Sequence, residues 1–167
     1  MNFLLNSLDQ ITVYLARAVK WLALLMVVVT LVIVLLRYLF NIGAIPLQES
    51  VMYMHGILFL IGIPYGLRQN THVRVDIFYA HRLSRWQREI NLCGHILFLL
   101  PLSLFIVYAS WPYTLASWRV LEGSPEVGGL PAIFLLKSLI PLTGVLLASQ
   151  GLVEIIRLLN PKLVRTD

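Results

Sequence analysis

The sequence predicts an all-α integral membrane protein with four transmembrane helices and with both termini in the cytoplasm. Of its 167 residues, 59% are hydrophobic and 13% are charged, and the mean hydropathy is +0.82. A soluble domain carries about 25% charged residues, and a chain this short cannot enclose so much apolar surface in one core. Four long apolar runs and an uneven distribution of basic residues complete the prediction.

The first twenty residues have the pattern of an amphipathic helix that leads into the first apolar run. They lack the basic N-terminal region and the small-residue cleavage site of a secretory signal. We expect this lead-in, residues 1–20, to lie at the membrane surface, or else to pack against a partner protein. Its apolar face is formed by Leu4, Leu8, Ile11, Leu15 and Val19, with Asp9, Gln10 and Arg17 elsewhere.

Four apolar runs are long enough to cross a bilayer, for which a helix needs about 20 apolar residues over a hydrocarbon core of about 30 Å. We expect transmembrane helices at about 21–40, 50–67, 86–111 and 130–155, within one membrane domain that comprises residues 1–167. The second run is the shortest. In the fourth run, the stretch 130–153 is interrupted by a charged residue, Lys137.

The basic residues indicate the orientation of these helices. Because short basic connections stay in the cytoplasm, the side that carries ten of them, against three elsewhere, is predicted to be the inner side. The basic pI of about 9.7 then reflects topology and attraction to membrane lipids, and nucleic acid is not an expected partner. The ten residues are Arg17, Lys20, Arg68, Arg74, Arg82, Arg85, Arg88, Arg157, Lys162 and Arg165.

Both longer connections are predicted to contain structure. Between the second and third spans, residues 75–83 form a short amphipathic segment that we expect to be an interfacial helix. Ser84 and Gln87 have the spacing of a capping box, which predicts a helix start near Arg85. The outer connection, 110–131, contains tryptophan and tyrosine residues that are typical of a membrane interface.

Histidines within the spans raise the alternative of a haem-bearing anchor subunit of a respiratory enzyme. His55 lies near the outer end of the second span, whereas His95 lies near the inner end of the third. At 1.5 Å per residue, their depths in the membrane differ by about 15 Å. The two histidines could therefore bind the same haem iron only if the predicted boundaries of the spans were shifted by a large amount.

The acidic residues argue against a stand-alone proton-coupled transporter, the second alternative. Carboxylates within a span mark ion and proton pathways, but all eight acidic residues lie outside the middle of the spans. No catalytic set can be assembled, and the single cysteine, Cys93, excludes an internal disulfide. We therefore expect no enzyme, no catalytic or metal-binding residue and no cofactor bound by this chain.

Lys137 is the residue whose placement in the membrane costs the most free energy. An ionised group within a span either extends to the interface or pairs with another residue. Glu49 and Glu122 lie at a suitable depth, and Arg37 competes for the same carboxylates. We interpret Lys137 as one half of an ion pair between helices.

Several polar motifs resemble the small membrane subunit, DctQ-like, of tripartite ATP-independent periplasmic (TRAP) transporters. Residues 48–50 (Gln-Glu-Ser) open the second span, Gly62 and Gly66 close it, and residues 72–76 (His-Val-Arg-Val-Asp) follow. The motifs at 110–113, 117–118 and 128–131, with Lys137 beyond, resemble the branch labelled mannitol/chloroaromatic. The similarity extends over nearly the whole chain.

The resemblance implies a small permease subunit in the inner membrane of a bacterium that takes up an organic acid by sodium symport. Its partners would be a large permease subunit (DctM-like), which carries the sodium sites, and a periplasmic binding protein (DctP-like). The cargo would be a 2-oxo acid, lactate or a similar carboxylate. The residues expected to organise the outer end are Arg37, Glu49, Arg119, Glu122 and Lys137, and those expected to order the inner loop are His72, Arg74 and Asp76.

Overall fold

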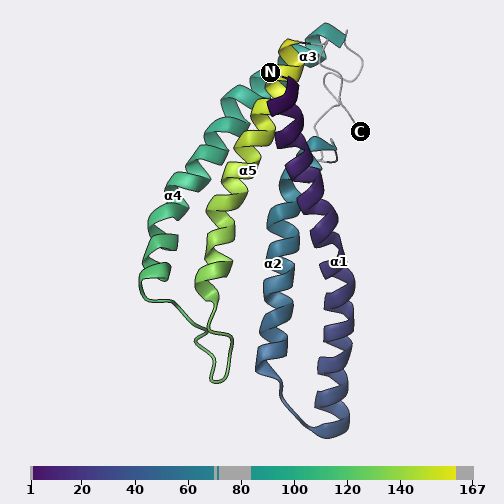
Figure 1. Cartoon of the computed structure of the whole chain (residues 1–167), viewed down its shortest axis with the longest axis vertical. Coiled ribbons are helices and arrows are strands. Elements are labelled where there is room, and N and C mark those ends of the chain that lie inside the picture. The colour runs from purple at the N-terminus through teal and green to yellow at the C-terminus, as the bar shows by residue number, and fades with distance from the viewer. Residues whose placement is uncertain (1, 70, 72–83, 161–167) are drawn as a thin grey trace.

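The computed structural model describes residues 2–69, 71 and 84–160, and these residues form helices joined by short connections (Figure 1). Helix α1 spans Asn2–Phe40, α2 spans Ile45–Arg68, α3 spans Ser84–Gly94, α4 spans Leu100–Arg119 and α5 spans Ile133–Leu159. A π-helical turn, His95–Leu99, joins α3 to α4. Four helical stretches are long and apolar enough to cross a membrane, as the sequence predicted.

Helix α1 differs from the expectation of a separate surface helix at residues 1–20, because it continues without a break into the first span. Leu8 and Ile11 of the predicted apolar face are 39% and 48% exposed, whereas Asp9 and Thr12 on another side of the helix are each 2% exposed. The polar face is buried because α2 and α5 supply partners for it. With 39 residues, the helix is about 58 Å long, well beyond a hydrocarbon core.

Two prolines explain where α2 begins and how α3 continues into α4. Helix α2 begins at Ile45 rather than near 50, because Pro46 suits the first turn of a helix, where no intrahelical N–H bond is required. Pro101 cannot donate a backbone hydrogen bond and crowds the preceding turn. The π-helical turn directly before it accommodates the ring, so that α3 and α4 form one continuous rod.

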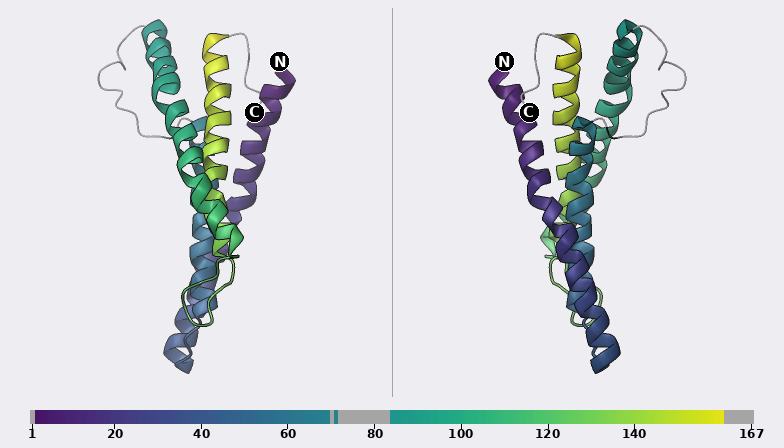
Figure 2. Two further views of the ribbon diagram at one scale, coloured as in Figure 1. Left: turned by 90° about the vertical axis from the view of Figure 1, so that its left-hand side faces the viewer. Right: turned by 90° about the vertical axis from the view of Figure 1, so that its right-hand side faces the viewer.

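The helices stand in the order α4, α5, α2, α1, as a curved row (Figure 1). Helix α5 packs against α4 on one side and α2 on the other, α2 packs against α1, and the first part of α1 also reaches α5. Helix α4 contacts neither α1 nor α2 within the described residues. Both views in Figure 2 show the start of α1 and the end of α5 at the same end of the bundle.

Glycines allow the close approach of α5 to α4. A Cβ atom on Gly144 would lie 2.7 Å from Val107 Cγ2 and 2.9 Å from the Ser103 carbonyl oxygen, and one on Gly151 would lie 2.8 Å from Leu99 Cδ2. Small residues let helix backbones approach closely in membranes. Helix α5 is therefore the central helix on which the others are assembled.

Candidate functional site

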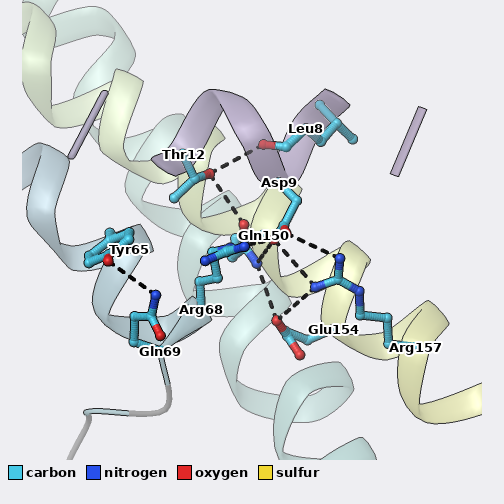
Figure 3. Close-up of polar contacts among 9 residues, drawn as sticks. All are labelled: Leu8, Asp9, Thr12, Tyr65, Arg68, Gln69, Gln150, Glu154 and Arg157. Atoms are coloured by element: carbon cyan, nitrogen blue, oxygen red, sulfur yellow. Dashed lines mark hydrogen bonds and ion pairs between the residues drawn. The ribbon is translucent and has the colours of Figure 1, made fainter. Parts of the chain in front are cut away.

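The most deeply buried charged residue among the described residues is Asp9, whose carboxylate connects three helices near the end where α1 begins (Figure 3). It accepts hydrogen bonds from both terminal nitrogens of Arg157 on α5, at 3.3 and 3.2 Å. Arg68, the last residue of α2, places its Nε atom 3.0 Å from Asp9 Oδ1. A charge-assisted, two-pronged arginine–carboxylate contact is among the strong polar interactions in proteins.

Gln150 completes this inner cluster from the adjacent turn of α5. Its amide nitrogen donates to Asp9 Oδ1 and to Glu154 Oε1, both at 3.2 Å. Its amide oxygen lies 3.2 Å from the Thr12 hydroxyl. Gln150 is 1% exposed, so its amide group forms its hydrogen bonds with other residues inside the bundle.

The charges of the inner cluster balance. Arg68 and Arg157 contribute two positive charges, and Asp9 and Glu154 contribute two negative ones, with Arg157 Nη1 3.8 Å from Glu154 Oε1. An uncompensated buried charge is costly, whereas a balanced and hydrogen-bonded group is tolerated and can specify one arrangement of helices. We conclude that the cluster fixes how α1, α2 and α5 meet.

A second cluster contains the predicted ion pair and lies at the opposite end of the bundle. The charge distribution predicts that this end faces outward, and we therefore call it the outer cluster. Lys137 Nζ lies 2.5 Å from Glu122 Oε2 and 4.0 Å from the centre of the Tyr113 ring. The hydrogen bond from Lys137 lowers the pKa of the Glu122 carboxyl in the connecting loop. The prediction that Lys137 pairs with a glutamate is confirmed, and the partner is Glu122.

The end of α4 positions Glu122 for this contact. Leu121 has a left-handed backbone with φ of 46°, and its N–H donates to the Trp118 carbonyl oxygen while the Glu122 N–H donates to that of Ser117. This pair of bonds is the Schellman termination of a helix. It reverses the chain and turns Glu122 back toward α5.

Glu49, in the first part of α2, binds the outer loop instead of Lys137. Its Oε2 atom accepts a hydrogen bond of 2.5 Å from the Leu130 N–H, and its Oε1 atom accepts one from the Ser124 hydroxyl. The Ser124 N–H in turn donates to the Leu130 carbonyl oxygen at 3.1 Å. A carboxylate on α2 therefore anchors the loop that connects α4 to α5.

The remaining predicted residues are not part of either cluster. Arg37 and Arg119 are exposed at the ends of α1 and α4, and no contact to another described residue is found for their guanidinium groups. His72, Arg74 and Asp76, like the predicted interfacial helix at 75–83, lie outside the described residues.

Sequence analysis did not identify the inner cluster. Asp9, Arg68 and Arg157 were counted only as charges on one side of the membrane. The sequence does contain one signal for this cluster. Gln150 is an amide within a largely apolar run, and a buried polar group requires a hydrogen-bonding partner.

The geometry of the described residues favours a structural role for these groups over chemistry. No group of three metal-ligating side chains occurs among them. Among the described residues, α2, which carries His55, makes no contact with the π-helical turn that carries His95.

Four apolar helices with paired charges at their ends define a small polytopic membrane subunit. A protein-family model described as "Tripartite ATP-independent periplasmic transporters, DctQ component" matches residues 26–160. This chain belongs to that family, and it is a multi-pass inner-membrane transporter subunit and not an enzyme.

One characterised relative supports the same assignment. The chain is similar to the C4-dicarboxylate TRAP transporter small permease protein DctQ of Vibrio cholerae serotype O1, with 26% identity over 88 residues. The match covers 53% of this chain and 38% of that protein. No solved structure matches the chain.

Proposed function

We propose that this chain is the scaffold subunit of a sodium-coupled TRAP transporter and that transport itself occurs in a large permease subunit (DctM-like). A periplasmic binding protein (DctP-like) would deliver the cargo, a 2-oxo acid, lactate or a similar small carboxylate. The sodium ions would bind in the large subunit.

The observation that carries this proposal is the uneven coverage of the four spans. In the most apolar 18-residue stretch of α1 and of the continuous span Trp86–Arg119, 6% of the residues are buried, whereas 44% are buried in α5. A chain that enclosed its own pathway would bury polar groups along facing helices. Here the polar clusters lie near the two ends, and the outer faces of α1 and α4 are left for lipid or another subunit.

The proposal can be tested by purifying the tagged chain from its native membranes in mild detergent and identifying the bound proteins by mass. A stoichiometric partner with roughly a dozen spans, the size expected for a sodium-coupled permease built from repeats, supports it. A chain that is isolated alone and transports in vesicles would favour the stand-alone transporter. A complex with haem absorbance would favour the respiratory anchor.

We also propose that both termini face the cytoplasm. The basic residues Arg68 and Arg157 contact Asp9 near the end at which α1 begins, which agrees with the rule that basic connections stay inside. In a Cys93→Ser background, Val127→Cys in the outer loop, 92% exposed, should react with a membrane-impermeant maleimide in spheroplasts. Gln69→Cys should react only after permeabilisation; the reverse pattern would overturn the orientation.

A further inference from the structure

A groove of about 810 Å³ lies along the seam between the first part of α1 and the end of α2. We propose that it binds the phosphate-bearing headgroup of an anionic phospholipid. The inference goes beyond the proposed function and does not depend on which subunits assemble with this chain. The polar side chains that line the groove are Ser7, Gln10, Tyr14 and Arg17 from α1 and Tyr65, Arg68 and Gln69 from α2.

The chemistry of this lining suits a phosphate. Its side chains offer hydroxyl, amide and guanidinium donors, and no carboxylate is among the described lining residues. Arginine and hydroxyl donors that converge on one concave site are typical of phosphate recognition. The carboxylate nearest in the structure, Asp9, is engaged by Arg68, Arg157 and Gln150, so it does not oppose an anion in the groove.

The two arginines contribute differently. Arg68 is held against Asp9 with its side chain 8% exposed, so its charge is compensated by that carboxylate. Arg17 is exposed, and no carboxylate is among the described residues that line the groove with it. Its charge is therefore the one that we expect to distinguish an anionic from a zwitterionic headgroup.

The position along α1 favours a lipid over a free phosphate. Tyr14, Arg17, Trp21, Leu25 and Val28 follow one another at intervals of three or four residues and so share one face of the helix. The last three are 63%, 47% and 50% exposed, and Lys20 Nζ lies 5.4 Å from the Trp21 ring centre. A headgroup at Arg17 would thus place its acyl chains along an apolar stripe, below an aromatic residue of the kind found at membrane interfaces.

Native mass spectrometry of the purified full chain in detergent, titrated with phosphatidylglycerol, phosphatidylcholine or inorganic phosphate, tests the proposal. Lys20→Gln is the matched control for Arg17→Gln, because both remove one exposed positive charge from the same turn and Lys20 does not line the groove. Phosphatidylglycerol should bind more tightly than phosphatidylcholine. Arg17→Gln should weaken it about tenfold, as expected for one charge-assisted hydrogen bond, and Lys20→Gln less than about twofold.

A second variant tests the same site with a smaller change in the side chain, so that a loss of binding is not attributed to altered folding. Tyr14→Phe keeps the ring and removes the hydroxyl, and it should weaken phosphatidylglycerol binding about threefold. Equal losses for Arg17→Gln and Lys20→Gln would show diffuse surface attraction and would overturn the site. Binding of inorganic phosphate as tight as that of the lipid, or equal binding of the two lipids, would overturn the assignment to an anionic phospholipid.

Discussion

Asp9, in the third turn of α1, and Arg157, near the end of α5, are 148 positions apart in the sequence and form a two-pronged ion pair (Figure 3). Arg68 approaches the same carboxylate from α2. The pair thus closes the chain on itself at one end of the bundle. It makes the first part of α1 a structural member of the fold rather than a peripheral lead-in.

Replacing Asp9 should therefore destabilise the whole bundle. Asp9→Asn leaves two arginines facing each other without a carboxylate between them, and breaking a buried pair in this way typically costs about 3–5 kcal/mol. We expect a lower unfolding temperature in detergent by tryptophan fluorescence and a lower yield of purified protein. Gln10→Ala, at an exposed neighbouring position, should change neither quantity. An unchanged unfolding temperature for Asp9→Asn would contradict the structural role of the cluster.

Lys137 is predicted to stabilise the outer end through both its charge and its volume. Lys137→Ala removes the pair with Glu122 and the contact with the Tyr113 ring, so it should lower the unfolding temperature and the yield of the assembled transporter. Lys137→Met should have a milder effect, because its side chain still fills the space next to the ring. Wild-type yield and uptake with Lys137→Ala would contradict the importance of this pair.

The same pair should make stability depend on pH. The hydrogen bond from Lys137 lowers the pKa of Glu122 below its ordinary value of 4.5, so its contribution is fully present above about pH 4.5. That contribution is lost as the pH falls through the depressed pKa of the folded state, since the unfolded chain then binds more protons. Unfolding temperatures measured from pH 7 to pH 3 should fall less steeply for Glu122→Gln than for the wild type. Parallel curves would contradict the assignment.

Two glycine substitutions should have opposite effects. Gly144→Ala introduces a Cβ atom 2.9 Å from the Ser103 carbonyl oxygen, and such overpacking typically costs about 1–3 kcal/mol. Gly62→Ala on α2 meets no atom within 4 Å, and alanine favours a helix over glycine by about 1 kcal/mol. The unfolding temperature of the isolated chain should fall for the first and rise slightly for the second. A stabilising Gly144→Ala would show that α4 and α5 do not pack as described.

Patterns within single segments were readable from the sequence because they depend on local composition. The four spans follow from apolar runs whose length matches a bilayer, and the pairing of Lys137 follows from the cost of an isolated charge within a span. Glu122 was a candidate because it lies at a suitable depth. Glu49 was an equal candidate by depth, and the sequence offered no means of choosing between them.

Tertiary structure decided which polar groups meet. Helical periodicity shows which residues of α1 share a face, but it does not show that α5 carries Gln150 and Arg157 at the height of Asp9. For this reason the sequence did not predict that Asp9 and Thr12 are buried against the other helices. The sequence by itself determined that this is a membrane protein of four helices and that basic residues are more frequent on one side of the membrane than on the other. The order of the helices and the inner cluster came only from their packing, because contacts between residues 59 to 148 positions apart leave no local pattern.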